Sequence, residues 1–167
     1  MQIITVSELI NAAIAAEESA RKIYLAFKHM FQRHEAIADF WQAMANDEEE
    51  HAHVLARIHG VVPVEALSSH INASLVVKAY ELQGIDINSL INSVNNLNDA
   101  YQIAYTLEAS EVNTVFNFLA INFLPKDESY NIISSLIDTH LLRLAEFTRT
   151  FGDARQCCKV PADKQNS

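Results

Sequence analysis

The most informative segment of the sequence is Asp47-Glu48-Glu49-Glu50-His51-Ala52-His53-Val54-Leu55, because it places acids and histidines inside an otherwise amphipathic helix. At helical spacing, Glu48 and His51 interrupt an apolar stripe whose members are Ile37, Trp41, Met44, Glu48, His51, Leu55 and Ile58. This pattern predicts that Glu48 and His51 point into the core. The second pair with the same spacing, Glu50 and His53, belongs to a polar stripe and is expected to face solvent.

An inward carboxylate needs compensation, because burying an unpaired charge costs several kcal/mol or forces protonation. Hydrogen bonds and ion pairs inside the protein are one form of compensation. A metal ion is the other, since Glu oxygen and neutral His nitrogen are suitable ligands. The Glu48-x-x-His51 spacing places both ligands one helical turn apart on the same face. The choice between these two interpretations depends on what the other helices contribute.

The composition favours one domain built from long helices. A chain of 167 residues is long enough to bury a sizeable core, and half of its residues are hydrophobic. It contains only three Gly and three Pro, so helix breakers are few. We therefore predict an all-α fold.

The charge and hydropathy patterns exclude several kinds of partner. A net charge of −9 argues against nucleic acid and against an anionic membrane surface. No long apolar run and no basic N-terminal region followed by an apolar core occur, so we expect neither a membrane span nor a secretory signal, and a cytoplasmic location. The two cysteines, Cys157 and Cys158, are adjacent and suggest free thiols instead of a disulfide framework or a Cys-x-x-Cys site.

The breaks in periodicity predict two antiparallel helical hairpins. Ser7 is the expected N-cap of the first helix, which runs to Phe31 or Gln32, and Gly60 is the expected end of the second. A crossover of roughly forty residues joins the hairpins, a length typical of bundles with a long connection. The later predicted helices cover 75–83 in the crossover, then 98–124 and 126–151. We expect a domain over 1–152 and a polar tail over 153–167.

Each of the other three long helices also carries a polar residue in its inward stripe. In the first helix this is Glu17, although a small rotation would exchange it with Glu18. The third helix offers Glu108, with Glu111 or Val112 one turn later, and the fourth offers His140. Taken singly, each residue has a structural interpretation, such as an ion pair between Glu108 and Arg143 or a hydrogen-bonded core histidine at position 140.

Taken together, these residues match a known layout. A carboxylate-bridged dinuclear metal centre in a four-helix bundle uses Glu from two helices and Glu-x-x-His from the other two. Between about Val6 and Phe151 the chain resembles the rubrerythrin branch of the ferritin-like diiron-carboxylate superfamily. The motifs that carry this resemblance are Glu17-Glu18-Ser19-Ala20-Arg21-Lys22-Ile23-Tyr24, 47–55, Glu108-Ala109-Ser110-Glu111 and His140-Leu141-Leu142-Arg143-Leu144.

The resemblance implies a ferritin-like bundle with two irons per chain, held by Glu17, Glu48, His51, Glu108, Glu111 and His140. One departure concerns the ligands: Ile137 stands where the family's second Glu-x-x-His has its Glu. Asp138 is a poor substitute, because it lies about a hundred degrees round the helix. Glu111, one turn beyond Glu108, could supply the missing carboxylate.

The resemblance further implies an oxidoreductase that reduces dioxygen or hydrogen peroxide and forms a homodimer or higher oligomer. No rubredoxin-like pair of Cys-x-x-Cys motifs occurs, so turnover would need a separate electron donor. Two alternatives remain: iron binding without turnover, and a metal-free degenerate scaffold that acts as an oligomeric interaction module. Tyr24 and Tyr105 are expected near the site as core aromatics with satisfied hydroxyl groups.

Overall fold

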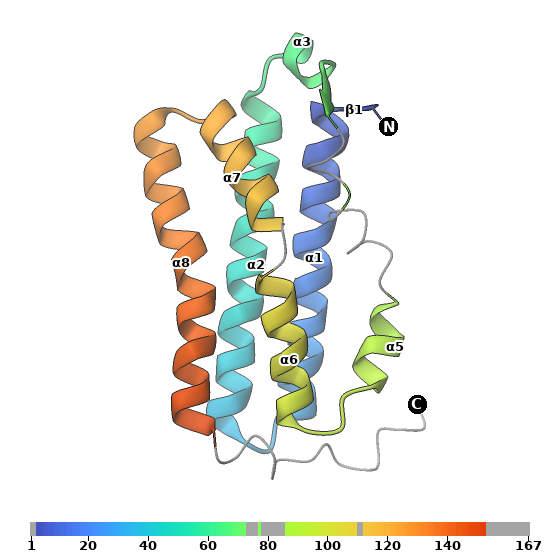
Figure 1. The fold of residues 1–167 in the computed structure, drawn as a ribbon, viewed down its shortest axis with the longest axis vertical. Coiled ribbons are helices and arrows are strands. Elements are labelled where there is room, and N and C mark those ends of the chain that lie inside the picture. The colour runs from blue at the N-terminus through green and yellow to red at the C-terminus, as the bar shows by residue number, and fades with distance from the viewer. Residues whose placement is uncertain (1–2, 73–76, 78–85, 110–111, 153–167) are drawn as a thin grey trace.

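The structure, a computed structural model, describes residues 3–72, 77, 86–109 and 112–152, without the side chains of 3–4, 72, 112–114 and 127–139. Its long helices stand side by side (Figure 1). The helices α1, α2 and α8 form three columns of the bundle, and α6 and α7 together form the fourth. This architecture confirms the predicted all-α four-helix bundle. The predicted tail, including Cys157 and Cys158, lies outside the described residues.

The first helix, α1, covers Val6–Met30, and its N-cap lies two residues before the predicted one. Its N-cap is Thr5, whose hydroxyl accepts a hydrogen bond from the Glu8 backbone N–H at 3.2 Å. The Glu8 carboxylate in turn accepts one from the Thr5 backbone N–H at 2.8 Å. This reciprocal capping box satisfies two N–H groups at once, so the prediction of Ser7 as the cap was wrong.

The second helix, α2, covers Glu35–Val61 and packs antiparallel against α1 after a short turn, as predicted. Gly60 was predicted to end α2, but it lies within the helix and does not adopt a left-handed backbone conformation. Val62 instead leaves the helix with φ −69° and ψ 128°. Val62 precedes Pro63, whose ring disfavours helical geometry in the residue before it.

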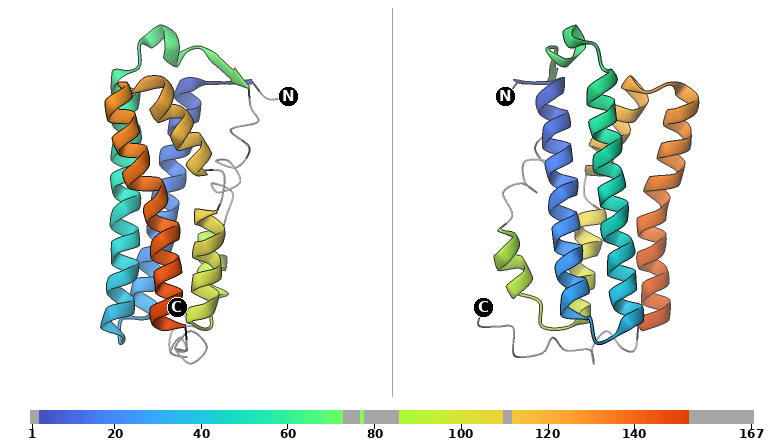
Figure 2. Two further views of the ribbon diagram at one scale, coloured as in Figure 1. Left: turned by 60° about the vertical axis from the view of Figure 1, so that its left-hand side comes forward. Right: turned by 180° about the vertical axis from the view of Figure 1, so that it is seen from behind.

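The described parts of the crossover lie on the outside of the bundle (Figure 2). It contains α3 over Val64–Leu67, then β2 over His70–Asn72, then α5 over Ile87–Asn92. The strand β2 pairs antiparallel with β1, Ile3–Thr5, in the register Ile4 to Ile71. This small ladder ties the crossover to the start of α1 and was not predicted. The helix predicted over 75–83 lies outside the described residues, apart from residue 77.

The third column is divided, whereas the sequence predicted one helix over 98–124. α6 covers Leu97–Glu108 and α7 covers Val112–Phe123 (Figure 1). No Gly or Pro marks the break in the sequence. The two pieces belong to different parts of the core, since the buried residues of α6 pack in one apolar cluster and those of α7 pack in another. The last long helix, α8, covers Lys126–Phe151 with Gly152 as its C-cap, as predicted.

Two apolar clusters make up the core. The first cluster surrounds Leu9, Leu55 and Phe116, and the second surrounds Trp41, Phe27 and Phe147. Along α1 and α2 they occupy opposite ends, so the middle of each helix lies between them. Among the described side chains, the buried polar residues are Glu17, Glu48, His51, Glu108 and His140. The helices in the described part of the chain include none that is long and apolar enough to cross a lipid bilayer.

Candidate metal centre

Five polar side chains from four helices meet between the two apolar clusters. Glu17 comes from α1, Glu48 and His51 from α2, Glu108 from α6 and His140 from α8; each exposes only 3 to 6 % of its surface. Their burial agrees with the inward positions predicted from the helical stripes. Glu18 is exposed, which decides between it and Glu17.

Glu48 lies at the centre of the group. Its Oε2 lies 3.3 Å from Nδ1 of His51, and its Oε1 lies 3.6 Å from Nδ1 of His140. The two imidazole rings are 4.9 Å apart between centroids. One ligand atom from each of these three residues falls within 4.8 Å of the others, so the three can contact a common cation.

Each of the remaining two carboxylates lies beside one of the two imidazole rings. Glu17 Oε2 lies 3.6 Å from Nδ1 of His51, and Glu108 Oε2 lies 2.8 Å from Nδ1 of His140. The Tyr24 hydroxyl donates a hydrogen bond of 2.5 Å to Oε1 of Glu108. The donor set therefore consists of two Glu-His pairs, with the Glu48 carboxylate between them.

Asp47 forms an outer contact that the sequence interpretation missed. Its Oδ2 lies 3.2 Å from Nε2 of His140 and also accepts a hydrogen bond from Arg143. Arg143 therefore pairs with Asp47, and the suggested ion pair with Glu108 is absent from the described contacts. The available signal was positional, because Asp47 directly precedes Glu48 and Arg143 lies one turn after His140.

The buried charges shift one another's protonation. Burial, and then the neighbouring carboxylates of Glu17 and Glu108, raise the pKa of Glu48 well above its usual value. Burial alone would also raise the pKa of Glu17, but hydrogen bonds with His51 and Glu48 lower it overall. Burial alone would lower the pKa of His140, yet Asp47 and Glu108 raise it to about 9. The carboxyl group of Glu48 therefore binds a proton more readily than an ordinary glutamate side chain does.

These properties fit a divalent cation. Three carboxylates and two imidazoles supply oxygen and nitrogen ligands in a dry interior, where cationic charge would replace the protons they otherwise need. His51 gives a second indication, because its Nε2 is buried without a hydrogen-bond partner in the part of the chain that the structure describes. A buried polar atom without a hydrogen-bond partner needs an explanation. Binding of a metal ion by His51 would supply one, because it would change the orientation and the protonation of the imidazole ring.

Several other predicted residues do not join this group. The side chains of Ile137 and Asp138, and all of Glu111, lie outside the described residues. Tyr24 is fully buried at the site, as predicted for a core aromatic with a satisfied hydroxyl group. Tyr105 is 49 % exposed, so its predicted place in the core near the site was wrong. It falls on the outer side of α6, one residue away from the buried Ala104.

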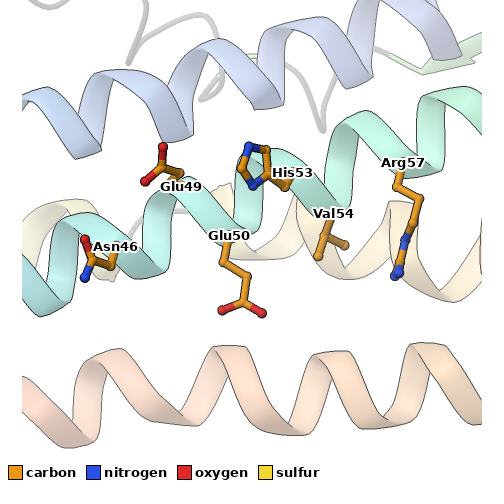
Figure 3. Close-up of a pocket in the computed structure, with 6 residues that line it drawn as sticks. All are labelled: Asn46, Glu49, Glu50, His53, Val54 and Arg57. Carbon is orange, nitrogen blue, oxygen red and sulfur yellow. The ribbon is translucent and has the colours of Figure 1, made fainter.

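The competing Glu-x-x-His pair occupies the outer face of α2. Glu50 and His53 are exposed and help to line an open pocket of about 520 Å³. Figure 3 shows His53 directed toward α1 and Glu50 toward α8, so the two side chains diverge. The prediction that this pair is solvated is confirmed.

Comparisons with known proteins place the chain in a family. The sequence model of the family described as Rubrerythrin matches residues 8–121. A proposed ferritin-like diiron-carboxylate protein from Thermotoga maritima has a similar solved structure, with a TM-score of 0.68, 18% identity, and coverage of 89% of this chain and 97% of that one. At this identity, the similarity supports the fold. No curated protein sequence gives a significant match. Because the family match spans more than half of the 167 residues and agrees with the bundle, the chain belongs to the rubrerythrin family.

Proposed function

We propose that this protein is a non-haem diiron oxidoreductase that reduces dioxygen or hydrogen peroxide at a carboxylate-bridged dinuclear iron site. One observation carries the proposal: the buried polar side chains of the described core are three Glu and two His that converge from four helices. A core carboxylate is retained at a cost to stability, and here three of them meet. Membership of the rubrerythrin family agrees with a diiron-type protein.

The geometry suggests which residues would hold each ion. Glu17 with His51 would hold one iron, and Glu108 with His140 would hold the other. Glu48 would contact both, because its two oxygens face the two imidazoles. Glu111 remains the proposed source of the carboxylate that Ile137 does not supply.

When bound, two Fe(II) ions supply two electrons together, which avoids release of a one-electron oxygen species. The protein's own residues prepare the site for this chemistry. Asp47, held by Arg143, contacts Nε2 of His140 and so leaves Nδ1 directed toward the carboxylates. Tyr24 keeps Glu108 in place through its hydroxyl group. The two apolar clusters exclude bulk water from the centre.

The electron donor is proposed to be a separate molecule, since the sequence carries no rubredoxin-like pair of Cys-x-x-Cys motifs. We likewise propose a cytoplasmic location and a homodimer or higher homo-oligomer. Ile137 favours a second candidate function: a bundle that has lost full metal binding and serves as an interaction module. Iron binding without turnover is the third alternative, and a measurement of turnover separates it from the first proposal.

The deciding experiment measures iron. The protein is expressed with iron, purified without chelating resin, analysed for metal, and then titrated anaerobically with Fe(II). We expect about two irons per chain, loss of uptake in Glu48→Ala, and unchanged uptake in Glu50→Ala, the matched exposed control on the same helix. Consumption of hydrogen peroxide or dioxygen with a chemical reductant then tests turnover. A wild-type protein that takes up no Fe(II) would contradict the proposal.

A further inference from the structure

A continuous series of aromatic rings leads away from the buried carboxylates. It begins at Tyr24, whose hydroxyl donates to Glu108 at 2.5 Å. The Tyr24 ring stacks on Trp41 with a centroid distance of 5.9 Å and an interplanar angle of 17°. Both rings are fully buried. The phenol that touches the candidate site is therefore also in contact with the only tryptophan of the chain.

The series continues from Trp41 to the surface. Trp41 contacts Phe147 at 5.5 Å, and Phe147 stacks on Tyr101 at 6.0 Å and 12°. Tyr101 stacks in turn on Tyr105 at 6.3 Å and 25°. Tyr105 is 49 % exposed, so the series ends in solvent on α6. Aromatic rings from α1, α2, α8 and α6 therefore connect the buried site to the outer surface.

The members of this series differ in what they do when oxidised. Tyrosine loses a proton together with its electron. The carboxylate of Glu108, which already accepts a hydrogen bond from the Tyr24 hydroxyl group, can accept this proton. Trp41 has no acceptor for its Nε1–H among the described residues. An oxidised Trp41 therefore cannot be trapped by losing its proton, and it returns to the neutral state by taking an electron from a neighbour. Phe147 is not oxidised, but it fills the space between Trp41 and Tyr101.

We propose that Tyr24, Trp41, Tyr101 and Tyr105 form a relay that carries single electrons from the surface to the buried site. The inference rests on the proposed function for the final electron acceptor, which is the iron site after hydrogen peroxide or dioxygen has oxidised it. Hydrogen peroxide or dioxygen is therefore the oxidant that drives the loss of an electron from Tyr24. It also assigns the place of electron entry: the surface of α6 around Tyr105, where an external one-electron donor would make contact.

Each passage through the relay balances. Tyr24 gives one electron to the oxidised site and its proton to Glu108. Trp41 reduces the resulting Tyr24 radical, which takes the proton back from Glu108. Tyr101 then reduces Trp41, and Tyr105 reduces Tyr101. Tyr101 is half-buried and Tyr105 is exposed, so each gives its proton to water when it is oxidised and takes a proton back when it is reduced. The external donor finally gives one electron to Tyr105. The donor is oxidised, the site is reduced by one electron, and no relay residue is changed.

Packing alone would also explain buried aromatic rings, so the test must detect electron movement. Metal-free protein is used, and a laser flash photoionises Trp41, the only tryptophan. Transient absorption then follows the tryptophan radical and any tyrosyl radical. We expect the tryptophan radical to decay as the tyrosyl radical grows at the same rate, independently of protein concentration.

Tyr→Phe variants keep the rings and remove the redox chemistry. Growth of the tyrosyl radical should persist in Tyr24→Phe, through Tyr101. It should also persist in the double variant Y101F/Y105F, through Tyr24, where the electron crosses the Tyr24–Trp41 contact in the direction opposite to that of the relay and so tests the same link. It should disappear in the triple variant, with a several-fold longer-lived tryptophan radical. The matched control is Y80F/Y130F, which removes the other two tyrosines and should behave as wild type.

Loss of tyrosyl growth in Tyr24→Phe alone, or in Y101F/Y105F alone, would show a broken link and overturn the relay. Growth that survives the triple variant or disappears in the control would overturn it as well. Because the measurement needs no iron, its failure is distinct from a failure to bind Fe(II). A circular dichroism spectrum of each variant confirms that the bundle is retained.

Discussion

Asp47 Oδ2 lies 3.2 Å from Nε2 of His140, while the other ring nitrogen of His140 lies 2.8 Å from Glu108. The imidazole is therefore fixed from both sides, with one nitrogen directed outward and the other toward the buried carboxylates. Arg143 holds Asp47 in this position. A contact of this type orients a ligand without touching the metal itself.

Asp47→Asn should weaken iron binding without unfolding the protein. The amide keeps the size of the side chain but loses the charge that holds the His140 ring. We expect the iron affinity to fall by about 10- to 100-fold, measured by competition with a chelator. Asp39→Asn, an exposed change on the same helix, is the control and should bind iron as wild type does. Equal affinities for the Asp47 variant and the wild type would show that the contact is irrelevant to the site.

Glu48→Gln should remove iron binding and stabilise the metal-free protein. Glu48 is buried against two other carboxylates, which raises its pKa. A neutral side chain of the same shape relieves that repulsion, so we expect the free energy of unfolding to rise by about 1 to 4 kcal/mol. Urea denaturation measures this change. Glu50→Gln on the exposed face should alter stability by less than about 0.5 kcal/mol. A destabilised Glu48 variant would instead indicate a carboxylate retained for structure.

The metal-free protein should lose stability as the pH rises from about 6.5 to 9. Folding raises the pKa of His140 from 6.5 to about 9, so the folded state binds more protons within this range. The contribution is complete below the unfolded pKa and is lost as the pH passes the folded one, a change of at most about 3 kcal/mol. Glu48, whose pKa is also raised, acts in the same direction. The lowered pKa of Glu17 acts at acid pH, outside this window.

Urea denaturation at several pH values measures this slope, and His140→Gln should flatten it. The affinity for metal should change in the opposite direction to stability. It should rise with pH, because the cation must displace protons from His140 and Glu48. Stability that increases between pH 6.5 and 9 would contradict the assigned contacts of His140.

Thr5→Ala should destabilise the protein by about 1 kcal/mol, because it leaves the Glu8 backbone N–H without its partner. The reciprocal bond from Glu8 predicts non-additivity: the double variant with Glu8→Ala should cost less than the sum of the two single variants. Thermal or urea unfolding of the wild type, the two single variants and the double variant measures the four free energies that this double-mutant cycle needs. Strict additivity would show that the two bonds are independent.

The sequence predicted the interior of the bundle better than its ends. Glu17, Glu48, His51, Glu108 and His140 were found because burial imposes a helical period, and a polar residue in an apolar stripe is visible in that period. The sequence predicted the helix ends less well. Thr5 and Ser7 are both suitable N-caps for α1, and the wrong one was predicted. At the end of α2, Pro63 sets the last residue of the helix, whereas the prediction relied on Gly60.

Contacts between distant segments cannot be predicted from the helical stripes of the sequence. The Asp47–His140 contact and the exposure of Tyr105 depend on helix rotation, which a stripe defines only coarsely. The division of the third column at Glu108 has no breaker in the sequence. It follows from each piece packing in its own apolar cluster, and such packing depends on the assembled core.

The polar layer between the two apolar clusters has a consequence for how the protein opens. α6 belongs to one cluster and α7 to the other, so the chain break coincides with the boundary between them. Without metal, the layer is joined by the contacts between Glu and His side chains and by the hydrogen bond from Tyr24 to Glu108. We then expect the two ends of the bundle to exchange their amide hydrogens as separate units. A cation bound by ligands from all four columns would link these units. Amide exchange would then slow at both ends together, and the bundle would open as a single cooperative body.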